Sequence, residues 1–132
     1  MTIGAYDARI KLLAVLDQGT PFTADTLKAG DAFDVIADIE VGKALNAVID
    51  RVQIFASVGN LTQFAPVQAQ TYDDPNPTAA DAPYRDRITI PFVALAGVNE
   101  GDILQASATL KVTAGIWIDY SAETSETVVV AA

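Results

Sequence analysis

The chain has 132 residues, of which 51% are hydrophobic and 19% are charged, and it contains neither cysteine nor histidine. The missing cysteine excludes disulfides, thiol nucleophiles and cysteine-ligated metal centres, and the missing histidine excludes Ser–His–Asp catalysis. The formal net charge is −9, and the eight basic residues are scattered along the sequence. This charge pattern argues against a nucleic-acid-binding face, so we expect no nucleic-acid partner.

The length and composition predict one globular domain over residues 1–132. The start of the chain has no basic segment followed by an apolar run, and the best apolar stretch, residues 12–16, is too short to span a membrane. We therefore expect no signal peptide and no membrane span. The expected location is the cytoplasm or a virion-type assembly.

Residues 6–16 alternate between apolar and polar side chains, which predicts a strand with one buried face. That face would carry Tyr6, Ala8, Ile10, Leu12, Ala14 and Leu16. Leu13 and Val15 break the alternation near its end, which allows both faces of the strand to be covered there. A long connection over residues 17–31 follows, with turn signals at Gly19 and Gly30. Residues 32–41 then alternate cleanly and predict a second strand.

Residues 44–59 allow two interpretations. Apolar residues at helical spacing, followed by Gly59, fit an amphipathic helix. Alternation from Val52 to Val58 fits a strand, and the high content of β-branched residues agrees with it. We favour a strand over about residues 50–58.

Five further extended segments are expected in the rest of the chain. Residues 64–72 predict an edge strand because Pro66 removes a backbone donor. Residues 73–83 carry three prolines and predict a loop, and residues 84–93 resume a strand. Residues 103–113 alternate cleanly, and Gly115 precedes shorter extended segments at 116–120 and 127–130. The two cleanest strands predict these buried residues: Phe33, Val35, Ile39, Leu104, Ala106, Ala108, Leu110 and Val112.

These elements predict an all-β fold of about seven strands. No regular alternation of strands with helical segments is visible, which argues against a parallel sheet. Two antiparallel sheets packed face to face would give each strand one buried side, as in an immunoglobulin-like layout.

The loop region has the densest cluster of oxygen side chains. It contains Asp73, Asp74, Asn76, Asp81 and Asp86. Calcium takes six to eight oxygen ligands, so calcium binding is one hypothesis for this loop. The alternative is a solvated acidic loop, which we favour because the spacing does not match the EF-hand loop and local carboxylate density alone is weak evidence.

The C-terminal segment is the strongest candidate for a contact with another subunit. Val128, Val129 and Val130 are β-branched, and no charged side chain follows Glu126. An uncharged strand edge can pair with another chain, unless the segment is an internal strand paired on both sides. We predict an intersubunit contact at these valines, with Trp117 or Tyr120 as an aromatic anchor. Trp117 filling the core is the alternative for that residue.

No catalytic set and no cofactor motif is apparent, so we predict neither enzymatic activity nor a cofactor. The sequence favours a structural subunit of a homo-oligomeric assembly of the virion or filament type. The alternative is a module that binds a small ligand, a glycan or calcium through its end loops.

Overall fold

The computed structural model describes residues 3–132. Within this range the chain forms nine strands and one short helix. In chain order they are β1 (Ala8–Asp17), β2 (Thr26–Lys28), β3 (Phe33–Val41), α1 (Lys43–Asn46), β4 (Arg51–Asn60), β5 (Ala65–Asp74), β6 (Tyr84–Phe92), β7 (Ile103–Ala114), β8 (Trp117–Thr124) and β9 (Val128–Ala131).

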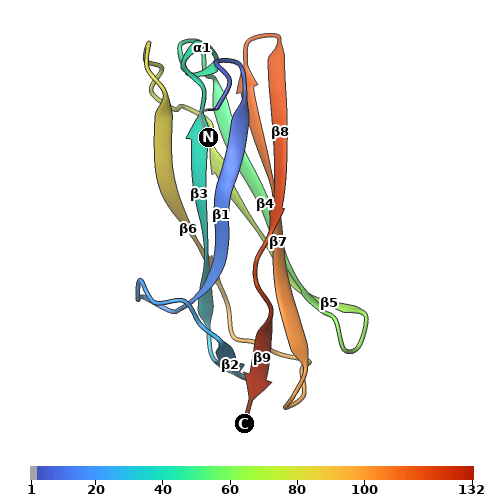
Figure 1. The fold of residues 1–132 in the computed structure, drawn as a ribbon. Helices are drawn as coiled ribbons and strands as arrows, with labels where there is room; N and C mark the ends of the chain where they lie inside the picture. The colour runs from blue at the N-terminus through green and yellow to red at the C-terminus, as the bar shows by residue number, and fades with distance from the viewer. Residues whose placement is uncertain (1–2) are drawn as a thin grey trace.

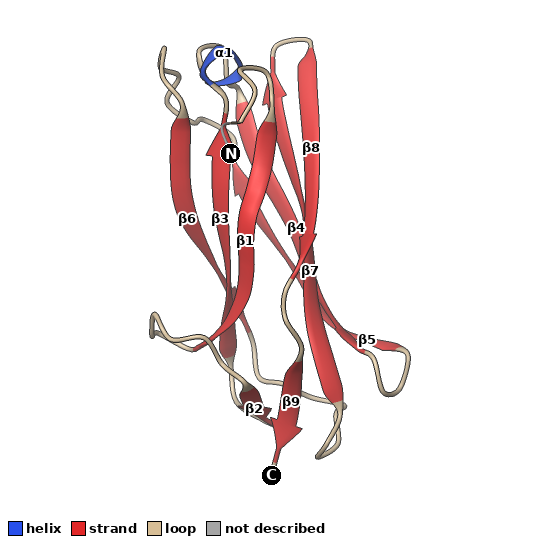
Figure 2. Cartoon of the chain, in the orientation of Figure 1, coloured by secondary structure: helices blue, strands red, loops and turns tan. Residues whose placement is uncertain are grey.

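The strands form two sheets that pack face to face in an elongated sandwich (Figures 1 and 2). The smaller sheet has the order β1-β3-β6, and the larger has the order β2-β9-β7-β4-β5, with β8 also paired to β7. All pairs are antiparallel except β2 with β9. The predicted all-β sandwich is confirmed, whereas the immunoglobulin-like layout stays a prediction.

The core lies between the inner faces of the two sheets. All eight residues that the alternation predicted to be buried are at most 4% exposed. Phe33 and Phe92, from neighbouring strands of the smaller sheet, stack with ring centroids 5.1 Å apart. The prediction of the core is therefore confirmed, because the period of two fixes which side chains share a face.

The ambiguous segment is a strand, as we favoured. β4 lies in the middle of the larger sheet and pairs with β5 on one side and β7 on the other. Its buried residues are Val52, Ile54, Ala56 and Val58. Only the short α1 before it is helical, so the long-helix interpretation is wrong. β5 is an edge strand that pairs with β4 within the described residues, as Pro66 predicted.

The predicted face of β1 is wrong beyond Ile10. The register against β3 shifts between Ile10 and Leu12, so two residues of β1 oppose one residue of β3. As a result Leu12 is 46% exposed, and Leu13 and Val15 enter the core instead. Ala14 and Leu16 form a second small cluster with Ile36. Tyr6 precedes the strand and is exposed.

Side chains bridge both seams between the two sheets. At one seam the Ala8 N–H donates to Asp119 Oδ2 (2.7 Å) and the Ile10 N–H donates to Ser121 Oγ (3.1 Å). At the other seam the Gln68 amide bonds both the N–H and the C=O of Val93, at 2.8 and 3.2 Å. These bonds satisfy edge groups that would otherwise be free to pair with another strand.

Gly42 sets the position of the N-terminal segment. Its N–H donates to the Asp7 carbonyl at 2.8 Å, and the Leu45 N–H donates to the Ala5 carbonyl at 3.0 Å. A Cβ at position 42 would overlap the carbonyl oxygens of Gly4 and Ala5. Only glycine allows this approach of two backbone segments.

We expect Gly42→Ala to displace the segment before β1 and to lower the free energy of unfolding by about 1–3 kcal/mol. Urea unfolding measures the loss, and emission from Trp117, whose ring lies 6.0 Å from that of Tyr6, reports the displacement. Gly59→Ala is the control, because nothing lies within 4 Å of a Cβ there. Equal effects of the two changes would contradict this role of Gly42.

Candidate functional site

β9 is an internal strand paired on both sides, which is the alternative that the sequence analysis weighed against a free edge. It pairs with β7 on one side and, in parallel, with β2 on the other. Val128 and Val130 are buried in the core, and only Val129 is substantially exposed. β2 was missed because it has only three residues and lies inside the predicted connection. The premise of a free edge is therefore wrong, while an intersubunit contact at these residues stays a prediction.

The other two predicted interface residues lie on β8, and both are exposed. Trp117 is 57% exposed and Tyr120 is 56% exposed, so Trp117 does not fill the core. Ile116 and Ile118 beside them are also exposed, as is Tyr6, whose ring centroid lies 6.0 Å from that of Trp117. We call these five residues the β8 patch. Contiguous exposed apolar side chains of this kind mark interaction sites.

Two features of the backbone build the β8 patch. Gly115 turns the chain with a φ of +63°, which places Ile116 at the end of the β7–β8 hairpin. Alternation along β8 then puts Ile118 and Tyr120 on the same side of the strand. Trp117 falls on the opposite side, toward Tyr6. The patch therefore wraps around one edge of the sandwich.

The seam beneath the patch fixes how a partner can approach. The Asp119 carboxylate accepts the Ala8 N–H and lies 3.3 Å from Arg9 Nη1, so β1 lies directly beside β8. An incoming strand would meet β1 at this position. The contact available to a partner here is made by side chains rather than by added backbone ladders.

Charges of both signs surround the β8 patch. Arg9 pairs with Asp7 (3.7 Å) and Asp119 (3.3 Å), and Lys111 Nζ lies 5.9 Å from the centroid of the Tyr120 ring. Asp50 accepts the N–H of Gly115 next to Ile116, so three acidic and two basic side chains lie around the patch. The two basic side chains offset part of the repulsion that the net charge of −9 produces between copies.

The acidic residues proposed for calcium have separate partners. The Asp73 carboxylate accepts bidentate hydrogen bonds from the Arg51 guanidinium (2.8 and 2.7 Å), which lower the pKa of Asp73. Asp81 lies 3.9 Å from Lys43, and Asp86 accepts the Tyr84 hydroxyl at 2.7 Å. Partial burial and the Asp86 carboxylate raise the pKa of Tyr84. In residues 3–132 no three carboxylates are grouped closely enough to hold a metal ion.

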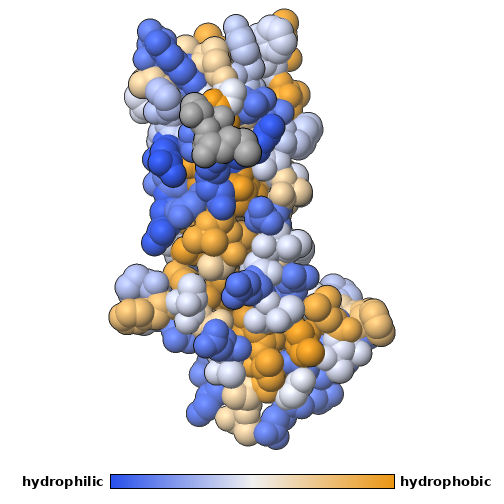
Figure 3. Space-filling model, in the orientation of Figure 1, coloured by the Kyte–Doolittle hydropathy of each residue, from blue (hydrophilic) through white to orange (hydrophobic). Residues whose placement is uncertain are grey.

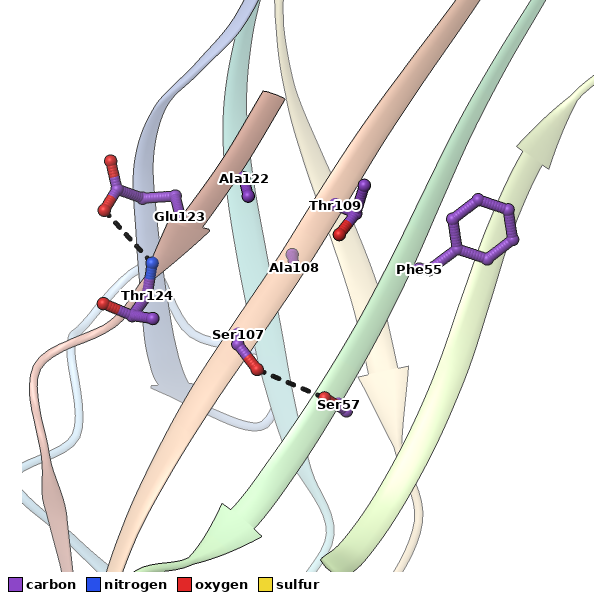
Figure 4. Close-up of a pocket in the computed structure, with 8 residues that line it drawn as sticks. All are labelled: Phe55, Ser57, Ser107, Ala108, Thr109, Ala122, Glu123 and Thr124. Atoms are coloured by element: carbon purple, nitrogen blue, oxygen red, sulfur yellow. Dashed lines mark hydrogen bonds between the residues drawn. The ribbon is translucent and has the colours of Figure 1, made fainter. Parts of the chain in front are cut away.

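A shallow depression on the outer face of the larger sheet has a mixed polar and apolar lining (Figure 4). Ser57 on β4 and Ser107 on β7 hydrogen-bond to each other across it at 3.2 Å. The Glu123 carboxylate turns back to accept the N–H of its neighbour Thr124. These polar groups satisfy one another. The expectation that the protein is not an enzyme stays a prediction.

Apolar side chains also form a band over β1 and around the lower end of the molecule near β9 (Figure 3). Part of this band is a groove of about 250 Å³ between β1 and the segment that leads into β9. The sequence analysis missed this groove because the bulge in β1 decides which side chains line it. It also did not identify Tyr6 and Phe64 as exposed residues of a candidate interface.

Within residues 3–132 no helix is long and apolar enough to cross a membrane.

Comparisons with known proteins give little further information. No family model matches the chain, and no curated protein is similar to it. Among solved structures, the CooA pilin subunit from enterotoxigenic Escherichia coli aligns over 87% of this chain and 99% of its own, with 9% identity and a TM-score of 0.31. A similarity at this level does not place the chain in a family.

Proposed function

We propose that this protein is a non-enzymatic structural subunit that associates with copies of itself in a surface assembly of the virion or filament type. The observation that carries the proposal is the β8 patch, which gathers five large exposed apolar side chains on one edge of the sandwich. Such patches are uncommon on monomeric proteins, and aromatic residues are enriched at the centres of protein interfaces.

The mixed charge around the patch is compatible with a second copy as the partner. Arg9 carries two acidic neighbours, Asp7 and Asp119, and Lys111 lies against Tyr120. Two copies that meet at this surface bring basic side chains of each copy toward acidic side chains of the other, although their net charges repel. At physiological salt the more distant charges are largely screened, because the Debye length is about 8 Å.

The aromatic residues are the expected anchors of this contact. Truncating an aromatic residue at the centre of an interface costs about 2 kcal/mol or more. That cost corresponds to an association constant about 30-fold lower. The combined variant Trp117→Ser/Tyr120→Ser should therefore dissociate the assembly at concentrations where the native protein is associated.

Sedimentation velocity over a range of concentrations tests the proposal. We expect the native chain to form species larger than the monomer and the combined variant to shift toward the monomer. Val93→Ser is the matched control, because Val93 is 63% exposed but lies outside the patch. A native chain that stays monomeric, or a variant that associates like the native chain, would refute the proposal. Stabilisation of a monomer by added calcium would favour the binding alternative.

A further inference from the structure

Phe64 combines two unusual properties. It is 94% exposed, more than any other large apolar side chain in the described residues, and it has a φ of +53°. A bulky residue rarely adopts this left-handed backbone conformation, and nothing buries its ring in return. Strain that does not serve the fold is typical of functional sites.

The turn that carries Phe64 is firmly held. The Gln63 N–H donates to Asn60 Oδ1 (3.0 Å), and the Gln63 side chain donates to Asp102 Oδ2 (2.7 Å). On the same turn, Thr62 Oγ1 accepts the Ile103 N–H at 3.0 Å. These bonds fix the hairpin between β4 and β5, which projects sideways from the sandwich in Figure 1. The Phe64 ring is therefore presented in a preorganised position, which lowers the entropy lost on binding.

The hairpin is also free of charge. Residues 52–72 contain no charged side chain, although the chain as a whole carries −9. Charge repulsion between copies therefore does not act on this hairpin directly. The hairpin can approach an acidic surface of a second copy without bringing like charges together.

The groove beside β1 fits an aromatic side chain. Leu12, Leu13 and Val15 line one wall and Val128 lines the other, with Asp25 and Glu126 also among the lining residues. Its volume is about 250 Å³, and a cavity of about 150 Å³ already accommodates benzene. Of these apolar side chains only Leu12 is substantially exposed, because the other three belong to the core. The groove thus offers a shallow apolar floor next to two acidic side chains.

We infer that Phe64 of one copy inserts into this groove of a second copy. The inference rests on the proposed self-association but uses surfaces outside the β8 patch. The hairpin projects to one side of the sandwich in Figure 1, and no residue of its turn is among those that line the groove, so Phe64 does not occupy the groove of its own chain. Because the two contacting surfaces differ, the contact is head-to-tail and generates a ring or an open filament.

Phe64→Gly separates association from folding. Glycine adopts a positive φ without steric cost, so the variant should unfold at the same or a higher temperature than the native chain. Its association, measured by sedimentation velocity, should weaken about 30-fold. Val48→Ser is the control, because Val48 is 53% exposed, belongs to neither the hairpin turn nor the groove, and should leave association unchanged. Native association of Phe64→Gly would overturn the inference.

Disulfide trapping tests the pairing of the two surfaces, because the chain has no cysteine of its own. We expect a mixture of Leu61→Cys and Thr127→Cys chains to form a mixed disulfide dimer under mild oxidation. A mixture of Leu61→Cys with Thr89→Cys, on β6, is the control and should form little. Adding Phe64→Gly to the Leu61→Cys chain should abolish the mixed product. Equal yields in both mixtures, or a yield independent of Phe64, would overturn the pairing.

The two contacts fail in different ways. If the Trp117→Ser/Tyr120→Ser variant loses association and Phe64→Gly does not, the result supports the β8 patch as the contact and refutes the insertion of Phe64 into the groove. If trapping at the groove persists in the Trp117→Ser/Tyr120→Ser variant and depends on Phe64, the inference stands without the patch. If the native chain is monomeric and no specific disulfide forms, both are wrong.

Discussion

Leu110→Ala is expected to lower the free energy of unfolding by about 2–5 kcal/mol. Leu110 is fully buried in β7, where it lies opposite Ile54 of β4 and Ser121 of β8. Removing its side chain leaves a cavity between the two sheets, and the β ladders on both sides of β7 limit how far the strand can move to fill it. Since single domains have about 5–15 kcal/mol of stability, the loss is a large fraction of the total.

Urea unfolding of Leu110→Ala and Thr109→Ala together tests the assignment of faces. Thr109 is the adjacent residue on the outer side of the larger sheet, and its truncation leaves no core cavity. We expect the Thr109→Ala midpoint to stay close to that of the native chain, as is usual for surface positions. A larger loss from Thr109→Ala than from Leu110→Ala would mean that the register of β7 is reversed.

The same alternation explains why much of the fold was predictable. In β7 burial follows the order of the residues, whereas the first half of β3 is buried on both faces, because Ile36 on its outer face packs with Ala14 and Leu16. In β1 the order of the residues does not decide which side chains are buried, because the bulge at Ile10 arises from pairing with β3, which is distant in the sequence. A local pattern cannot specify a register set by another strand.

The C-terminal strand shows the same limit at longer range. Val128 and Val130 were recognised as strand residues, but their second neighbour is β2, about one hundred residues earlier in the chain. A three-residue strand gives almost no periodic signal, so the sequence left a free edge and an internal strand both open, and the structure shows the internal strand. Pairing partners, unlike strand propensity, depend on the closure of long loops.

The candidate site was predictable only in part. Trp117 and Tyr120 were identified as large aromatic residues near a turn, and their exposure agrees with that interpretation. Tyr6 joins them through a contact between opposite ends of the chain. Phe64 has no signal in the sequence, because a positive φ at a non-glycine residue follows from the geometry of its turn.

Asp102→Asn is expected to lower the unfolding temperature by several degrees. One oxygen of the buried Asp102 accepts three bonds, from the Asn99 N–H (2.9 Å) and from the side chains of Asn60 (2.8 Å) and Gln63 (2.7 Å). An amide oxygen can occupy the same position, but its bonds lack the negative charge that strengthens them in the carboxylate. The buried Asn60 amide would lose the most, because no water replaces its partner.

The pH dependence of this loss identifies its cause. The bond from the Asn99 N–H, followed by those from Asn60 and Gln63, lowers the pKa of Asp102 in the folded chain. A lowered folded pKa gives a stabilisation that is complete above the unfolded value of about 3.9 and is lost as the pH falls through the folded value. The difference in unfolding temperature between the native chain and Asp102→Asn should therefore be constant from pH 7 to about 5 and shrink below about pH 4. Asp31→Asn, in an exposed turn, controls for the change in net charge. If the difference does not depend on pH, the effect of Asp102 comes from the shape of the turn rather than from its charge.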